Sequence, residues 1–268
     1  MKKTFEAYMS KLESDIRNSR FSFNFLSRFV VIWTLLTRIP LPKRFWPEEN
    51  IQGKDALALS PLVGGIIGML TALIVLFFCF LRVGNLAASW IGVAFYVLSG
   101  WAIHLDGWSD LWDGFGSGKS KEELRSVMKD SCLGSYGVIG LILALALWTT
   151  LLASVPNTQK IAALMVAAST GRFAMCVAAL KGEYPWERGL AKGWVDGFEG
   201  YDIFLSFICS LFFMPIAPFS WIISMFLVSV SSYFLSAHMN KKLGGVNGDV
   251  LGAVAVLGEL LSLVVFAL

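Results

Sequence analysis

The sequence predicts an all-α fold, a polytopic integral membrane bundle of about seven transmembrane helices preceded by an N-terminal interfacial helix. The composition points to a bilayer, because 56% of the 268 residues are hydrophobic and only 15% are charged, whereas soluble domains carry about 25% charged residues. The hydrophobic residues also gather in runs of about 20, the length that a helix needs to cross a membrane. We therefore expect one membrane domain over residues 1–268.

The N-terminal segment, residues 1–42, is expected to lie at the membrane interface or to re-enter the membrane without crossing it. Residues 1–20 are charged and loosely amphipathic, and residues 21–37 are more apolar but contain Arg28. An Arg-Ile-Pro-Leu-Pro sequence then closes this apolar stretch, which is shorter than the roughly 20 residues of a spanning helix.

The transmembrane bundle is expected over residues 57–268. Pro215 and Pro218 divide its longest apolar run into two spans, because proline interrupts a helix. A short amphipathic helix is expected outside the bilayer over residues 119–131, and residues 181–202 form a polar connection. The expected spans are about 57–81, 86–105, 134–153, 160–180, two within 203–237, and 250–268.

The distribution of basic residues sets the expected orientation. One set of alternate connections carries most of the lysine and arginine, so the positive-inside rule places that set in the cytoplasm. An eighth span over residues 21–41 would put the basic N-terminus outside, against this rule. The orientation brings three polar segments, 106–118, 181–202 and 244–249, to the cytoplasmic side of a bacterial inner (cytoplasmic) membrane. We expect the active site there.

Three aspartates directly follow the second apolar run, at spacings of four and three. On a continuous helix, about 100° per residue places all three within roughly 60° of one another. Carboxylates this close repel one another unless a cation lies among them, and Mg²⁺ binds oxygen ligands of this kind. The alternative is a solvated helix end with an acidic cap. The predicted metal ligands are Asp106, Asp110 and Asp113.

Glycines follow the aspartates and are expected to form a loose loop whose backbone amides contact phosphate. They are Gly114, Gly116 and Gly118. Asp249, after a tight Asn-Gly turn at the start of the last span, is a further candidate metal ligand.

Other charged side chains within or near the spans are candidates for function. Arg172 and Arg188 suit bidentate phosphate contacts, although an arginine near a span end also snorkels to the interface. His104 is either a packed, hydrogen-bonded histidine or a catalytic proton-transfer group. Glu259 lies inside the last span, where a carboxylate is costly, so it is either functional or hydrogen-bonded to a neighbouring helix.

Acids and a metal at a membrane face are typical of phosphoryl transfer, in which metal ions neutralise phosphate oxygens and stabilise the leaving group. A nucleotide-activated substrate fits this chemistry, because a nucleoside monophosphate leaves readily. The net charge of +3 is too small to indicate nucleic-acid binding.

The run His-Leu-Asp-Gly-Trp-Ser-Asp-Leu-Trp-Asp-Gly at residues 104–114 resembles the signature of the cobalamin synthase family, the adenosylcobinamide-GDP ribazoletransferases. Several further segments support the resemblance in the family's order. The chain departs from the family pattern at Trp108-Ser109, Asn247 and Val256. The supporting segments are residues 37–42, 60–64, 128–131, 134–137, 171–172 and 244–253, with Glu259.

The resemblance implies the last joining step of cobalamin biosynthesis. Adenosylcobinamide-GDP and α-ribazole, or its 5′-phosphate, give adenosylcobalamin, or its phosphate, and GMP, with Mg²⁺ required. Asp106 and Asp110 are then metal ligands, and Asp113 either binds metal or, like Asp130, takes the hydroxyl proton. Membrane lipid and a second copy of the chain are the further partners considered.

Two rivals use similar residues. A CDP-alcohol phosphotransferase also carries aspartates at helical spacing, but its usual Asp-Gly-x-x-Ala-Arg start is missing, since Asp110-Leu111 stands in place of Ala-Arg. A cation or cofactor transporter normally carries its acids at mid-membrane along broken helices, whereas these are expected at one surface.

Overall fold

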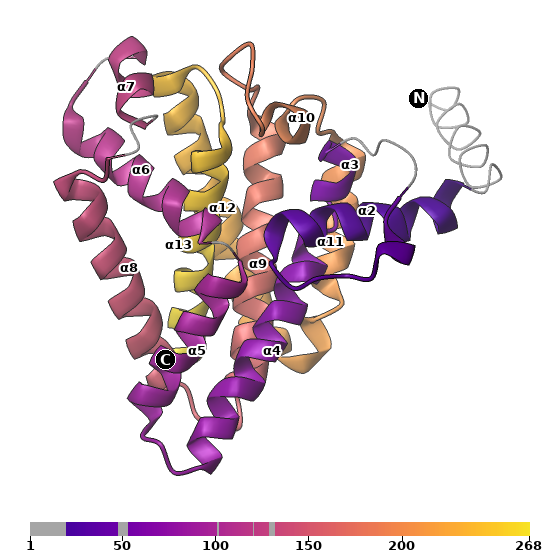
Figure 1. The fold of residues 1–268 in the computed structure, drawn as a ribbon, viewed down its shortest axis with the longest axis vertical. Helices are drawn as coiled ribbons and strands as arrows, with labels where there is room; N and C mark the ends of the chain where they lie inside the picture. Colours follow the sequence, from indigo (N-terminus) through magenta and orange to yellow (C-terminus); the bar gives the residue numbers. More distant parts are fainter. Residues whose placement is uncertain (1–19, 48–52, 101, 120, 129–131) are drawn as a thin grey trace.

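The computed structural model describes residues 20–47, 53–100, 102–119, 121–128 and 132–268. These residues form helices and connecting segments, with no strand among them (Figure 1). The helices are α2 (Arg20–Leu36), α3 (Gly53–Leu57), α4 (Ser60–Phe80), α5 (Asn85–Ser99), α6 (Ile103–Ser117), α7 (Lys121–Met128), α8 (Ser135–Ser154), α9 (Lys160–Lys181), α10 (Lys192–Val195), α11 (Gly200–Leu211), α12 (Pro218–Leu243) and α13 (Gly248–Ala267), with 3₁₀ turns η1 (Lys43–Phe45) and η2 (Met214–Ile216).

The predicted all-helical, polytopic membrane fold is confirmed. Among the described residues, five helices are long and apolar enough to cross a membrane, namely α4, α8, α9, α12 and α13. The pair α5 and α6 makes a sixth span if it is counted as one broken helix. The count of seven is not confirmed, because α11 has only 12 residues before the chain turns at η2.

The expected span over 86–105 is wrong in its last part. The helix ends at Ser99, and a new helix begins at Ile103 after a bend of 91°. The Ser99 carbonyl accepts a hydrogen bond from the Arg38 amide, and Ala102 adopts a left-handed conformation with φ 54°. The helical hydrogen-bond ladder therefore stops, and the aspartate motif lies on a helix of its own.

The N-terminal helix α2 lies crosswise to the long helices of the bundle in Figure 1. It is 17 residues long and packs on α3 and α4. A crosswise, short apolar helix is the arrangement expected of an interfacial segment. The charged helix predicted over residues 1–20 lies almost wholly outside the described residues.

Helix α9 lies at the centre of the bundle, with α4 and α13 packed along its length. Within its apolar 18-residue stretch, 83% is buried, whereas only 33% is buried in the corresponding stretches of α8 and α12. Seven of its 22 residues are alanine, and small residues let helix backbones approach closely in membranes. The predominantly exposed apolar faces of α8 and α12 are suited to contact lipid.

The closest approach of α4 to α9 occurs at Gly64 and Gly68, one turn apart. A Cβ atom on Gly68 would lie 2.2 Å from the Leu164 carbonyl oxygen, and one on Gly64 would lie 2.3 Å from the Ala168 carbonyl oxygen. Both distances are too short for contact, so only glycine permits this packing.

Replacing Gly68 with alanine is expected to lower stability by about 1–3 kcal/mol, since the two helices must separate. Unfolding of the purified protein in mixed detergent micelles measures the loss. Gly84→Ala is the control, because no atom lies within 4 Å of a Cβ built there. Equal stability of the two variants would contradict the close α4–α9 packing.

Candidate active site at the polar end of the bundle

Helices α6 and α13 bring the two aspartate motifs together. A Cβ atom on Gly107 would lie 2.7 Å from the Cα of Asp249, so the helix backbones touch beside Asp106. Asp110 lies within electrostatic range of Asp106, Asp113 and Asp249, and Asp249 lies within range of Asp106. We call Asp106, Asp110 and Asp249 the acid cluster. Its members come from segments about 140 residues apart, as the predicted topology requires.

The turn before α13 fixes the Asp249 carboxylate. Asn247 caps the helix, because its Oδ1 accepts a hydrogen bond of 3.0 Å from the Val250 amide. Its Nδ2 donates to Oδ2 of Asp249 at 2.7 Å. The asparagine that departs from the family pattern thus performs a capping and an orienting role in this chain.

Asp113 holds the start of helix α8. Its Oδ2 accepts from the Gly134 amide at 2.8 Å and its Oδ1 from the Gly137 amide at 2.7 Å. A carboxylate at this position satisfies amides that lack partners within the helix and complements the positive helix end. The sequence motif predicts a metal-binding or proton-accepting role for Asp113 and does not indicate this capping role.

Replacing Asp113 with alanine is expected to lower the free energy of unfolding by about 0.5–2 kcal/mol, the usual effect of losing a helix cap. Asp113→Asn, which keeps one acceptor oxygen, should lose less. Thermal unfolding in detergent tests this, with Asp106→Ala on the same helix as control because Asp106 is exposed. A larger loss in the Asp106 variant would contradict the capping role.

The glycine loop expected after the aspartates is not present. Helix α6 continues through Gly114 and Gly116 to Ser117, so the free amides predicted to meet phosphate lie within the helix. Gly114 packs under Leu124 and Met128 of α7, whereas a side chain on Gly116 would meet the ring of Tyr136. Of the three glycines, only Gly118 lies beyond the helix. Its φ is 62°, and no atom lies within 4 Å of a Cβ built there.

Residues 182–199, which connect α9 to α11, pack against the turn before α13. The Val246 amide donates to the Glu183 carbonyl at 2.9 Å. Partial burial, and then the negative charge of Asp249, raise the pKa of Tyr184. Arg188, the predicted phosphate ligand, is exposed in this segment.

Basic and aromatic side chains accompany the acid cluster. The Arg125 guanidinium of α7 lies 4.8 Å from the centre of the Trp186 ring, and Lys192 pairs with Asp196 at 2.9 Å. Partial burial opposes ionisation of Asp196, but the Tyr184 amide and Lys192 outweigh it and lower the pKa of this carboxyl. Neither Arg125 nor Tyr184 was predicted to belong to the site, because only the folded chain brings Tyr184 near both Asp249 and Arg125. Asp130 lies outside the described residues.

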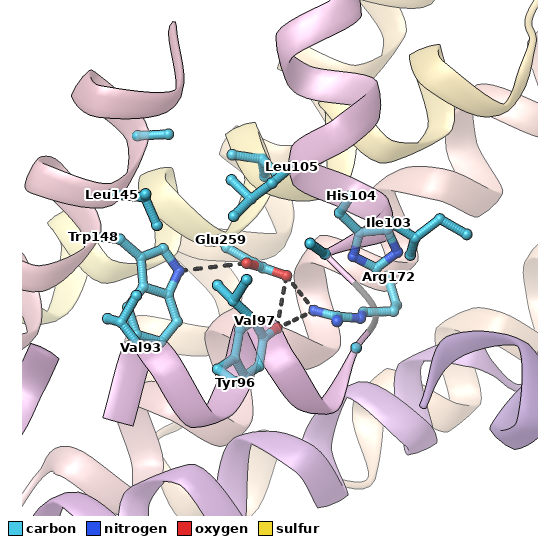
Figure 2. Close-up of a pocket in the computed structure, with 14 residues that line it drawn as sticks. Val93, Tyr96, Val97, Ile103, His104, Leu105, Leu145, Trp148, Arg172 and Glu259 are labelled. Carbon is cyan, nitrogen blue, oxygen red and sulfur yellow. Dashed lines mark hydrogen bonds and ion pairs between the residues drawn. The ribbon is translucent and has the colours of Figure 1, made fainter. Parts of the chain in front are cut away.

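A second polar group lies deeper in the bundle, around Glu259 (Figure 2). The Arg172 guanidinium pairs with Oε1 of Glu259 and also donates to the Tyr96 hydroxyl. Tyr96 donates to Glu259 at 2.7 Å, and the Trp148 indole donates to its Oε2 at 3.4 Å. Four helices, α5, α8, α9 and α13, contribute one residue each. Of the two alternatives expected for Glu259, the structure shows the buried acid that is hydrogen-bonded to neighbouring helices.

Arg172 lies nine residues before the end of α9, or about 13 Å along its axis, and it is only 4% exposed. It is thus farther from the polar end than the sequence suggested, and its observed partner is a carboxylate. The predicted phosphate contact of Arg172 stays a prediction.

His104 lines the same deep region and lies beside Arg172 (Figure 2). Its position on α6 is about 160° around the helix from Asp106. His104 is packed in the bundle, and its Nε2 is buried without a protein partner in the described part of the chain. The hydrogen bond and the proton-transfer role expected from the sequence both stay predictions.

Within the described ranges, no three histidine, cysteine, aspartate or glutamate side chains converge as a ready metal site. The acid cluster nevertheless has the donor chemistry of an Mg²⁺ site, with carboxylates on two touching helices. Asp106 is exposed and Asp110 is partly exposed, so both carboxylates are accessible to an ion from solvent.

The helical membrane fold and the neighbouring carboxylates define a membrane-embedded protein with an acidic site at one end of its bundle. The chain belongs to the cobalamin-5-phosphate synthase family, whose model matches residues 28–267.

Curated relatives cover nearly the whole chain. A protein of Thermoanaerobacter sp. (strain X514) is 30% identical over 246 residues, covering 90% of this chain and 97% of the relative. One from Rhizobium johnstonii is 31% identical, covering 87% and 93%, and one from Acetivibrio thermocellus is 30% identical, covering 91% and 98%. Each is named adenosylcobinamide-GDP ribazoletransferase. No solved structure matches the chain.

Proposed function

We propose that this protein is a transferase that joins adenosylcobinamide-GDP to α-ribazole, or to α-ribazole 5′-phosphate. The products are adenosylcobalamin, or its phosphate, and GMP, in the last assembly step of cobalamin biosynthesis. Family membership across residues 28–267 carries the proposal. The acid cluster lies within that range, at the touching ends of α6 and α13.

In the proposed reaction, the α-ribazole hydroxyl attacks the phosphorus nearest the cobinamide. A new P–O bond forms between this phosphorus and the ribazole oxygen. The bond from the same phosphorus to the bridging oxygen of the diphosphate breaks, and GMP departs with that oxygen. The hydroxyl proton must pass to a base. Asp113 and Asp130 are the proposed acceptors, and Asp113 would have to release one of its two amide contacts to act.

Mg²⁺ is the proposed cofactor, and Asp106, Asp110 and Asp249 are its proposed ligands. None of the three pairs with a lysine or arginine among the described residues. A divalent ion would remove their mutual repulsion and, when bound, neutralise charge on the diphosphate during transfer. Arg188 and Gly118 are further candidates for phosphate contact, because both are exposed at this end of the bundle.

The proposed location is the cytoplasmic membrane, with the acid cluster toward the cytoplasm. Lys181 ends α9, and Lys241 and Lys242 lie in the last turn of α12, all at the end of the bundle that carries the acid cluster. Basic residues favour the cytoplasmic side. Labelling of a cysteine introduced at Gly118 in intact cells tests the orientation, and modification by an impermeant reagent from outside would overturn it.

The activity test uses the purified protein with adenosylcobinamide-GDP, Mg²⁺ and either α-ribazole or its 5′-phosphate. GMP release together with the visible spectrum of the corrinoid product is expected, and EDTA is expected to stop both. Comparison of the two acceptors identifies the preferred one. Release of CMP from CDP-diacylglycerol instead would favour the CDP-alcohol phosphotransferase. Corrinoid uptake into proteoliposomes without GMP release would favour the transporter.

A further inference from the structure

A small, partly open cavity lies where α5, α6, α8, α9 and α13 meet (Figure 2). Its volume of about 40 Å³ exceeds the roughly 10–15 Å³ that one water molecule needs. Most of the wall is apolar, formed by residues such as Val93, Leu145 and Val256, but His104, Arg172 and Glu259 also line it.

Two polar atoms at this cavity have no hydrogen-bond partner among the described residues. They are Nε2 of His104 and Nε of Arg172, and Figure 2 shows the two side chains next to each other. Buried polar atoms nearly always find a partner, either protein or ordered water, because an unpaired one is costly. The Arg172 and Glu259 charges cancel within their ion pair, so a neutral occupant fits the cavity better than an ion.

We propose that ordered water fills this cavity and joins His104 to Arg172, and that the Arg172–Glu259 pair thereby positions the start of helix α6. His104 is the second residue of α6 and precedes Asp106 by two positions. The effect of this link on turnover rests on the proposed function, whereas its effect on the order of α6 does not.

The start of α6 needs such a link because its backbone is not continuous with α5. The chain bends by 91° between them, and Ala102 has a left-handed φ of 54°. On the α13 side, a Cβ on Gly252 would lie 3.0 Å from the His104 carbonyl oxygen, so α6 and α13 touch there without a side chain between them. The water-linked imidazole supplies a polar tie to α9, which the close α6–α13 packing alone does not provide. In this proposal His104, Arg172 and Glu259 act as positioning residues.

The test compares His104→Leu, which fills similar space without a polar atom, with His104→Gln, which can still bind water. Hydrogen–deuterium exchange of the α6 amides is measured in detergent, together with turnover and the Mg²⁺ concentration for half-maximal rate. In His104→Leu we expect α6 exchange to rise and the half-saturating Mg²⁺ concentration to increase about tenfold, the low end for loss of a group that orients metal ligands. His104→Gln should restore most of both. His104→Ala replaces the leucine variant if that variant does not accumulate.

The matched control removes another buried polar contact between α9 and α13. Thr170 and Ser262 share a hydrogen bond of 2.7 Å away from the cavity, so Thr170→Val should leave α6 exchange and Mg²⁺ half-saturation unchanged. The proposal would be overturned if α6 amides in His104→Leu exchanged at the wild-type rate. It would also be overturned if His104→Gln were as impaired as His104→Leu. Absence of turnover in the wild-type protein would count against the proposed function instead, because the exchange comparison needs no activity.

Discussion

Replacing Asp106 or Asp110 with asparagine is expected to reduce GMP release by about a hundredfold or more, the usual effect of losing a group that controls transition-state charge. Asparagine keeps the size of the side chain and removes the negative charge that the proposed Mg²⁺ requires. Asp249→Asn should lose a similar amount, because Asp249 lies against Gly107 on the facing helix. The measurement is GMP release at saturating adenosylcobinamide-GDP over a range of Mg²⁺ concentrations.

The matched control for these variants is Glu187→Gln, which removes an exposed carboxylate of the 182–199 segment and is expected to leave the rate near that of the wild-type protein. Partial recovery of the aspartate variants at high Mg²⁺ concentration would indicate weakened ion binding. Near-normal turnover in both Asp106→Asn and Asp110→Asn would remove the acid cluster from the reaction and end the metal proposal.

Replacing Glu259 alone with leucine is expected to destabilise the protein by about 3–5 kcal/mol, since a buried charge would lose its partner. Both side chains of the pair are only 5% exposed, so the remaining Arg172 guanidinium would stay buried without its counter-charge. Arg172→Met should cost a similar amount by leaving Glu259 unpaired. The double variant should be more stable than the sum of the single losses predicts, because it leaves no charge behind. Unfolding in mixed micelles provides the double-mutant cycle.

Thr149→Val serves as the control for this cycle, because it removes a buried hydroxyl that bonds only to the Leu145 carbonyl of its own helix. Its loss should be well below that of either charged residue. Additive losses for Arg172→Met and Glu259→Leu would mean that the two side chains do not form an energetically coupled pair.

The sequence determined the class of fold because the length of an apolar run fixes which helices can cross a bilayer. Five of the expected spans correspond to long helices, including α4, α9 and α13. The limits of α5 escaped prediction because residues 86–105 read as one apolar run, while the break follows from a tertiary hydrogen bond between Arg38 and Ser99. Likewise, Pro218 marks the start of α12 as predicted, but nothing in residues 203–211 shows that α11 is too short to cross on its own.

The candidate site was predictable where neighbouring residues in the sequence share a helix face. Asp106 and Asp110 are such a pair, and helix α6 carries both. Helical periodicity gives no information about what each side chain meets in another helix. It could not show that Asp113 caps α8, that His104 faces the deep cavity, or that Arg125 reaches Trp186.

From the sequence alone came the membrane fold, the aspartate helix and the family resemblance, because hydrophobic length, helical spacing and motif order are local properties of the chain. Only the tertiary structure joined Asp249 to Asp106 across about 140 residues and paired Arg172 with Glu259 inside the bundle. Such contacts depend on how glycines let helices approach and on which buried charges must find partners. Those conditions are met only when the helices have packed.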